Sequence, residues 1–192
     1  MISAIILAAG ESKRMGQPKM LLKWGNSTVL SSVIATFQSA GVSDIVVVTG
    51  GARELVESEI GKYARTIFND NFSRGEMLSS LQTGLSAMKP DAEAVLIGLG
   101  DQPQVEERCV RLVMEEYRQT GAPIVVPSYQ MHRGHPWLVT RSLWAQIMSM
   151  TYPESPRDFL DRFRREIHYA EAETPSILMD LDTPEDYLKT RP

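Results

Sequence analysis

Cationic residues follow the first apolar run of the chain, residues 4–9, which reads Ala-Ile-Ile-Leu-Ala-Ala. Gly10 ends this run, and Arg14 and Lys19 lie in the loop that comes next. Arginine offers a planar fork of N–H donors to a phosphate group, and lysine offers a compact positive charge. Gly10 has no side chain, so a ligand can approach the backbone closely there, and the residue can adopt φ > 0. The loop is therefore either a binding site for a phosphate-bearing ligand or a solvated turn with ordinary surface cations.

Acidic residues at two places could hold a hard metal cation. Asp101 directly follows a predicted buried strand. Asp180 and Asp182 are separated by one residue in the stretch Met-Asp-Leu-Asp-Thr-Pro-Glu-Asp at 179–186. Asp180 and Asp182 point to the same side if this stretch is extended. Mg²⁺ usually takes one or two carboxylates together with phosphate oxygens. The alternative for Asp101 is a turn aspartate that caps the next helix, and for the other two, acids that favour the N-terminus of the last helix.

Hydrogen-bond donors gather in the middle of the chain. Gly75 precedes a predicted helix whose first turn carries Ser79 and Ser80, and Asn69 lies a few residues before it. The first turn of a helix has N–H groups without helical partners, and serine hydroxyls add further donors. These donors could hold the base or ribose of a nucleotide, and N-capping by a serine would explain the same residues.

His135 is the one histidine of three that suggests a role, because it lies in the segment Arg-Gly-His-Pro at residues 133–136. The alternative is a surface histidine held in a proline-bounded turn. The spacing of histidine and cysteine shows no zinc pattern, and no Ser-His-Asp arrangement can be read from the chain. The sequence therefore favours neither zinc chemistry nor a serine nucleophile.

Apolar periodicity predicts that strands alternate with helices and so place these residues. Strands are predicted at residues 4–9, 45–48, 65–68, 92–100, 124–126, 135–140 and 166–170. Helices are predicted at residues 28–40, 54–60, 77–88, 106–119, 141–148, 155–164 and from residue 183 onward. This alternation predicts an α/β fold of three layers, in which a mainly parallel, Rossmann-like sheet has helices on both faces. Ligands bind such sheets beyond the carboxyl ends of the strands, where the Gly10 loop and Asp101 are expected.

Composition narrows the class of protein. The chain has 192 residues, of which 43% are apolar and 23% charged, and these values suit one soluble globular domain over residues 1–192. Its net charge of −4 gives no general basic field for nucleic acid or for a membrane surface. The single cysteine, Cys109, cannot form an internal disulfide, and the N-terminal apolar run is too short for a signal or a membrane span. We therefore expect a cytoplasmic protein.

Residues 7–19 resemble the signature of the MobA-like nucleotidyltransferases, which include the molybdenum cofactor cytidylyltransferases. They read Leu-Ala-Ala-Gly-x-Ser-x-Arg-Met-Gly-x-Pro-Lys, which is a longer and more specific pattern than a lone Gly-x-Gly. Four later segments are similar to the family in the same order. They are Asn69 with the Gly-x-Met-x-Ser-Ser-Leu stretch, Gly-Asp-Gln-Pro at 100–103, Arg-Gly-His-Pro at 133–136 and Asp-Thr-Pro at 182–184.

The resemblance implies a nucleotide-diphospho-sugar transferase type of fold and a set of site residues. Residues expected to bind the nucleotide are Leu7, Ala8, Ala9, Gly10, Arg14, Lys19, Asn69, Gly75 and Ser80. Arg14, Lys19 and Asp101 are expected to serve catalysis, and Asp101 and Asp182 are expected to hold Mg²⁺. His135 is expected on the acceptor side of the site.

Ala-Ala-Gly rather than Ala-Gly-Gly in the first loop resembles the branch that uses CTP, and Arg-Gly-His-Pro points to molybdopterin as the acceptor. The implied reaction transfers CMP to the phosphate of molybdopterin and releases pyrophosphate. A transient contact with a molybdenum hydroxylase is also implied. The alternatives are a GTP-using guanylyltransferase, a sugar- or alcohol-phosphate nucleotidyltransferase, and a non-catalytic carrier of the cofactor. Residues 152–158 depart from the family, because they lack the glycines of its Gly-Asp-x-Gly-type segment.

Overall fold

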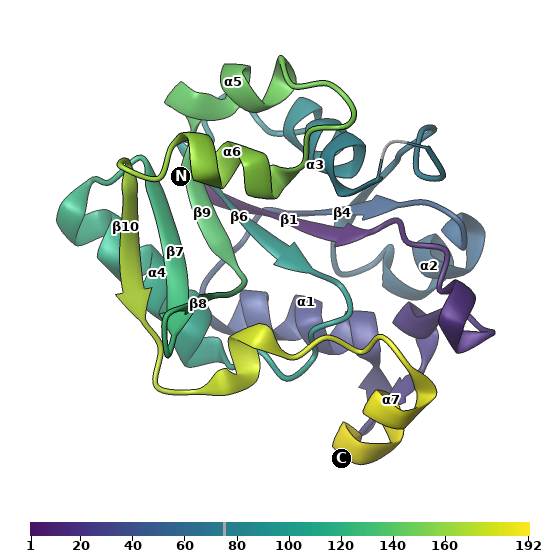
Figure 1. Ribbon diagram of the computed structural model, residues 1–192. Helices are drawn as coiled ribbons and strands as arrows, with labels where there is room; N and C mark the ends of the chain where they lie inside the picture. Colours follow the sequence, from purple (N-terminus) through teal and green to yellow (C-terminus); the bar gives the residue numbers. More distant parts are fainter. Residues whose placement is uncertain (75) are drawn as a thin grey trace.

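One mixed sheet of eight strands forms the centre of the computed structural model, which describes residues 1–74 and 76–192 (Figure 1). Along the sheet the order is β10-β7-β9-β6-β1-β4-β5, and β8 pairs with β7. Its strands are β1 (Ile2–Ala8), β4 (Ile45–Thr49), β5 (Arg65–Phe68), β6 (Ala94–Leu99), β7 (Ile124–Tyr129), β8 (His132–Arg133), β9 (Trp137–Thr140) and β10 (Ile167–Glu171). Strands β2 (Lys23–Trp24) and β3 (Ser27–Thr28) form a separate small hairpin.

Helices cover both faces of this sheet, as Figure 1 shows. They are α1 (Val29–Ser39), α2 (Arg53–Ile60), α3 (Glu76–Ser86), α4 (Glu107–Thr120), α5 (Trp144–Met148), α6 (Pro156–Arg162) and α7 (Pro184–Thr190). Short 3₁₀ turns occur at η1 (Lys13–Met15), η2 (Lys19–Leu21), η3 (Arg141–Leu143) and η4 (Pro175–Leu178). The predicted three-layer α/β architecture is confirmed.

Strand β1 shows why the two helical layers form. Successive side chains of a strand point to opposite faces. Ala4 and Ile6 therefore pack in the core that includes α1, α2 and α4, whereas Ile5 and Leu7 pack in the core that includes α3, α5 and α6. Both faces of the strand are buried, which explains its unbroken apolar sequence.

The sheet is mainly parallel, with local exceptions that periodicity did not predict. Strand β1 is parallel to its neighbours β4 and β6, whereas β9 runs antiparallel to both β6 and β7. Strands β2, β3 and β8 have two residues each, too few to show a period of two. Among the described residues, no helix combines the length and apolar character that crossing a membrane requires.

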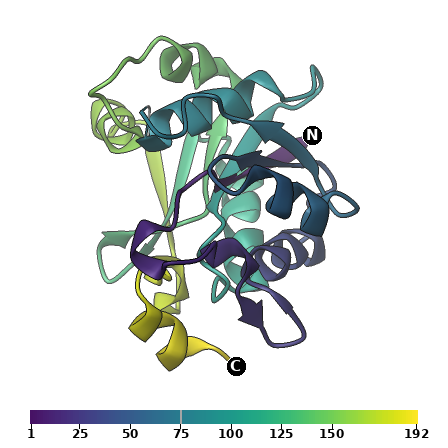
Figure 2. The same cartoon turned by 90° about the vertical axis from the view of Figure 1, so that its right-hand side faces the viewer.

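The C-terminal segment returns to the carboxyl ends of the strands. After β10 and η4 the chain runs to α7, as the yellow ribbon of Figure 1 shows. The backbone N–H of Leu181 donates to the carbonyl of Asp101 at 3.0 Å, and Leu181 is fully buried against Met15, Leu22 and Val29. Figure 2 shows α7 below the purple N-terminal segment that includes η1 and η2. This contact brings residues 180–182 to the first loop.

Candidate functional site

The first loop and Asp101 meet because they follow neighbouring parallel strands. Leu7 of β1 is opposite Leu99 of β6, and the N–H of Gly100 donates to the carbonyl of Leu7 at 2.9 Å. A Cβ on Gly100 would lie 3.1 Å from that carbonyl oxygen, so the two strand ends approach closely. This is the arrangement that the sequence predicted for the carboxyl edge of the sheet.

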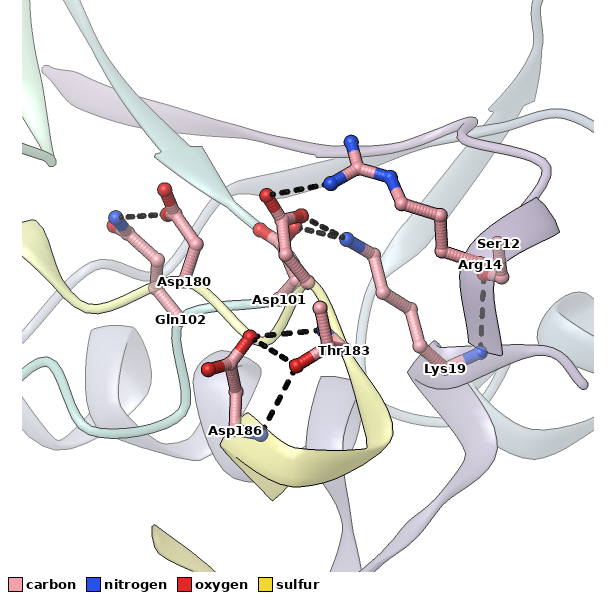
Figure 3. A network of polar contacts seen from close by, with 9 residues as sticks. Ser12, Arg14, Lys19, Asp101, Gln102, Asp180, Thr183 and Asp186 are labelled. Carbon is pink, nitrogen blue, oxygen red and sulfur yellow. Dashed lines mark hydrogen bonds and ion pairs between the residues drawn. The ribbon is translucent and has the colours of Figure 1, made fainter. Parts of the chain in front are cut away.

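Lys19 contacts both carboxylates that were predicted to hold a metal, and Figure 3 shows its side chain directed at Asp101. Its Nζ forms a short ion pair with Oδ2 of Asp101 and is 3.4 Å from Oδ1 of Asp182. The backbone N–H of Lys19 donates to the hydroxyl of Ser12 at 3.1 Å, which fixes the residue at the start of η2. The side chains of Lys19 and Asp101 are only 12% and 16% exposed, so these opposite charges interact where water screens them weakly.

Arg14 reaches the same group of charges from the solvent side. Its Nη1 is 3.5 Å from Oδ2 of Asp182, and its side chain is 72% exposed. Ser12, with φ of 52°, and Gly16, with φ of 67°, take the left-handed backbone conformation on either side of η1. Gly10 does not have this left-handed conformation. Its contribution is open space beside the backbone, because a Cβ on Gly10 would meet no atom within 4 Å. A ligand can therefore approach the Gly10 backbone while Arg14 faces it.

Thr183 caps the start of α7 together with Asp186, whereas the side chain of Asp182, the residue before it, takes no part in this cap. The Thr183 hydroxyl accepts a hydrogen bond from the N–H of Asp186 at 3.2 Å, and the Asp186 carboxylate accepts from the N–H of Thr183 at 2.9 Å. This capping box begins α7. With Asp186 engaged in the cap, Asp182 is directed at Lys19 and Arg14.

Asp180 is directed at a different partner from Asp182. Its Oδ1 accepts a hydrogen bond from Nε2 of Gln102 at 2.7 Å, as Figure 3 shows. Burial raises the pKa of Asp180, and the nearby charge of Asp101 raises it further. Gln102 is 3% exposed, and its Oε1 has no hydrogen-bond partner among the residues that the structure describes. Sequence reasoning missed Gln102, although its place next to Asp101 in Gly-Asp-Gln-Pro was a usable signal.

Two adjacent hollows border these charges. One of about 290 Å³ includes Arg14, Lys19 and Asp182, and another of about 270 Å³ lies over the ends of β1 and β6. The second is lined by Leu7, Ala9, Gly10, Lys19, Met20, Phe72, Met77, Ser80, Leu99 and Asp101. Gly10 and Lys19 line both, so an elongated ligand could extend from one to the other. Of the predicted nucleotide-binding residues, Ala8 is 4% exposed, packs in the core and lines neither hollow.

The Asn69 amide is engaged in holding the loop before α3. Its Nδ2 donates to the hydroxyls of Ser79 and Ser80 at 2.9 and 3.0 Å, and its Oδ1 accepts from the N–H of Asn71. Asn69 is 1% exposed, so it positions Ser80 at the wall of the hollow. Gly75 lies outside the described residues.

His135 does not line either hollow beside Lys19 and Asp101; it lines a larger hollow of about 770 Å³. Met77 borders both this hollow and the one over β1 and β6, so the two are neighbours. The N–H of His135 donates to the carbonyl of Ile177 at 3.1 Å, and burial lowers the pKa of the imidazole to about 4. The ring is therefore neutral at physiological pH and can accept a hydrogen bond as well as donate one.

The two carboxylates that contact Lys19 could serve as ligands of a hard divalent cation. Among the described residues, no group of three or more histidine, cysteine, aspartate or glutamate side chains could hold a metal ion. Asp101 and Asp182 offer two carboxylates that lie close to each other, because both contact the ammonium group of Lys19. Mg²⁺ is typically held by one or two carboxylates with the remaining positions filled by water and phosphate. Two carboxylates beside a cationic loop therefore fit a metal that arrives with a phosphate ligand.

Comparison with known proteins gives matches along the chain. A family model described as MobA-like NTP transferase domain matches residues 4–168. The molybdenum cofactor cytidylyltransferase of Escherichia coli (strain K12) is 31% identical over 195 residues, and the match covers 99% of this chain and 95% of that protein.

Solved structures agree with this match. Rv0371c from Mycobacterium tuberculosis H37Rv superposes with a TM-score of 0.87 at 26% identity, covering 98% of this chain and 95% of that one. A nucleotidyl transferase from Methanothermobacter thermautotroptrophicus superposes with a TM-score of 0.84 at 25% identity, covering 100% and 96%. Rv0371c has also been solved in a complex with manganese, with a TM-score of 0.79 at 24% identity, covering 98% and 96%. The fold is the one that nucleotidyltransferases share.

Proposed function

The chain belongs to the MobA-like NTP transferase domain family and is a nucleotidyltransferase, and from this premise we propose that it transfers CMP from CTP to the phosphate of molybdopterin. The observation that carries the proposal is the group formed by Lys19, Arg14, Asp101 and Asp182 beside a hollow at the carboxyl edge of the sheet. A full-length relative at 31% identity is a molybdenum cofactor cytidylyltransferase, which supports this choice of substrates.

The reaction would be an in-line displacement at the α-phosphorus of CTP. An oxygen of the acceptor phosphate forms the new P–O bond while the bond to the pyrophosphate oxygen breaks. Such chemistry depends on positioning and on neutralising negative charge rather than on a protein nucleophile. Arg14, which is exposed and borders the loop hollow, would bind the triphosphate from outside, and Lys19 would offset the charge that develops on the leaving pyrophosphate. Gly10 would let the phosphates lie against the loop backbone.

Asp101 and Asp182 would hold a divalent cation, which we propose is Mg²⁺. A carboxylate has two oxygens and several acceptor positions, so contact with Lys19 through one oxygen of Asp101 leaves the other for a metal. When bound, the metal would supply Lewis-acid polarisation of the α-phosphoryl group. Asp180 would keep Gln102 and the neighbouring backbone in place through its hydrogen bond.

The neighbouring hollow of about 770 Å³ would receive the acceptor. His135 lies on its wall, and Met77 borders both this hollow and the one on the nucleotide side. Because the His135 imidazole is neutral, it would position the acceptor through a hydrogen bond rather than through charge. We further propose that residues 1–192 act as one domain in the cytoplasm, where the single buried cysteine would stay reduced, and that the product is passed to a molybdenum hydroxylase.

The test is release of pyrophosphate by the purified protein with molybdopterin, Mg²⁺ and each of CTP, GTP, ATP and UTP in turn. We expect release with CTP and loss of release in Asp101→Asn, which keeps the size of the side chain but removes the charge that binds a cation. Release with GTP alone would identify a guanylyltransferase. Nucleotide binding without release would direct the search to sugar and alcohol phosphates as acceptors. Absence of nucleotide binding would favour a non-catalytic carrier of the cofactor.

A further inference from the structure

The wall of the acceptor hollow includes two residues, Pro156 and Arg157, of the segment in which this chain departs from its family. Residues 152–158 lack the expected glycines, and the structure uses part of this segment to begin α6. Ser155 caps the helix through a capping box and Pro156 is its first residue, so the start of α6 has a defined backbone. Pro156, Arg157, Leu160 and Asp161 then line the hollow. The divergent segment is therefore a structured part of the proposed acceptor site.

Most charged side chains of α6 and of the residues just before it, among them Asp161 on the wall of the hollow, are engaged with partners inside the protein. The pairs are Glu154 with Arg162, Asp158 with Ser155 at 2.6 Å, and Asp161 with Arg133 at 2.6 Å. Hydrogen bonds from the Ser155 hydroxyl and backbone N–H lower the pKa of Asp158, which agrees with its role in the cap. Arg133 also lines the hollow, but its guanidinium is fixed by Asp161 and by the hydroxyl of Tyr169 at 3.0 Å. These charges maintain the wall and are not available to a ligand.

Arg157 is the exception on α6. Among the residues that the structure describes, its side chain has no ion pair and no hydrogen-bond partner, and it is exposed at the edge of the hollow. Its backbone is held by the capped first turn, so the guanidinium extends from a fixed point. The hollow itself is largely apolar, with Trp137, Leu160 and Leu178 among its lining residues. It combines an apolar surface with one arginine that lacks an internal partner.

We propose that Arg157 determines specificity for the acceptor by binding an anionic group of that molecule, while the apolar surface packs against its ring system. This inference rests on the proposed function, since it assigns the acceptor to this hollow. Arginine can form two parallel hydrogen bonds to a phosphate-like group, which would fix the orientation of the acceptor as well as its affinity. The residues at 152–158 would thus replace the glycine-containing segment of the family with a different means of holding the acceptor.

The first experiment compares Arg157→Gln with Arg165→Gln in steady-state kinetics. Arg165 is exposed, lies just beyond α6 and does not line the hollow, so it is a control for the loss of one surface charge. We expect Arg157→Gln to raise KM for molybdopterin about tenfold, the size expected for one hydrogen bond to a charged group. KM for CTP and kcat should remain within about twofold, and Arg165→Gln should match the wild type. Arg157→Lys should recover part of the loss, because lysine keeps the charge but not the fork.

The second experiment measures binding of molybdopterin without nucleotide, followed by quenching of tryptophan fluorescence, because Trp137 lines the hollow. Weaker binding by Arg157→Gln than by Arg165→Gln supports the inference even if the wild type turns over no nucleotide, an outcome that would reject only the proposed reaction. Equal KM and equal binding in the two variants would overturn the inference. So would a wild type that neither binds molybdopterin nor releases pyrophosphate with it, or an Arg157→Gln variant that loses CTP binding instead.

Discussion

Lys19 connects the parts of the proposed site that lie farthest apart in the sequence. Its ammonium contacts Asp101 and Asp182, its N–H is held by Ser12, and its side chain is only 12% exposed. A buried cation of this kind is kept in place by its carboxylate partners and can act on a phosphate without reorganising. Arg14 differs from it, because an exposed side chain can follow a ligand as it enters and leaves. The two cations therefore suit two tasks, stabilising developing charge and binding the triphosphate.

The neutral state of His135 predicts how stability depends on pH. Burial lowers the pKa of the folded-state imidazole from 6.5 to about 4, so between these values the unfolded chain binds a proton that the folded chain does not. Stability should therefore rise with pH across this window, by about 3 kcal/mol in total. His135→Gln should reduce that rise, as measured by urea unfolding at pH 4.5, 5.5 and 7. His132→Gln, on the exposed end of β8, is the control, and an unchanged slope in His135→Gln would contradict the buried environment.

Two glycines with different surroundings, one in the loop between β1 and η1 and one packed against it, determine what this loop tolerates. Gly10 faces open space, whereas a Cβ on Gly50, just after β4, would lie 2.2 Å from the carbonyl oxygen of Ala9. The residue that follows β4 therefore packs directly against the backbone at the start of this loop. Sequence reasoning identified Gly10 through its place after the apolar run, but it did not predict the close contact of Gly50 with Ala9, because that contact depends on how β1 and β4 pair.

These surroundings predict opposite effects of the same substitution. Gly50→Ala should destabilise the fold by about 1–3 kcal/mol, because the backbone of Ala9 must move to admit the methyl group. Gly10→Ala should leave stability within about 1 kcal/mol of the wild type, since no atom within 4 Å opposes the methyl group, and yet weaken nucleotide binding at least tenfold. Thermal unfolding and nucleotide titration separate the two. A stable Gly50→Ala, or a Gly10→Ala that binds nucleotide normally, would contradict this description of the loop.

Predictions from the sequence were accurate where a long apolar period exists. Strand β1 and helix α4 were placed within two residues of their observed bounds, because each buries a continuous apolar face. Gln102 was missed because its role depends on Asp180, a residue 78 positions away that approaches only when the tail folds back. Asp180 and Asp182 were expected to share one direction, but the first contacts Gln102 and the second contacts Lys19 and Arg14.

The whole molecule has a net charge of −4, yet its proposed substrates are anions. Attraction must therefore come from local cations at the carboxyl edge of the sheet rather than from the overall field. The C-terminal tail completes that edge by bringing Asp182 to the first loop, and Leu181 anchors it against Met15 and Leu22. Apolar periodicity did not predict the path of this tail, because a single buried leucine between two aspartates carries no periodic signal; only the family resemblance implied that Asp182 lies near Asp101.

Leu181→Ala tests whether the tail holds the site together. Leu181 is fully buried, so the substitution should cost about 3 kcal/mol of unfolding free energy in urea. It should also lower metal-dependent nucleotide affinity, because Asp182 follows directly in the chain. Leu188→Ala is the matched control, since Leu188 in α7 is 59% exposed and should change stability by less than about 0.5 kcal/mol. Equal stability of the two variants would contradict the anchoring role.

The measurement that tests the proposed site most directly is the rate of pyrophosphate release by Lys19→Ala with CTP, molybdopterin and Mg²⁺. The control is Lys62→Ala, which removes an exposed lysine that lines none of the site's hollows. We predict that Lys19→Ala lowers turnover at least about 100-fold, as for loss of a group that stabilises developing charge, while the protein remains folded. Lys62→Ala should keep wild-type turnover. Near-normal turnover in a folded Lys19→Ala would contradict the assignment of nucleotidyl transfer to this group of charges.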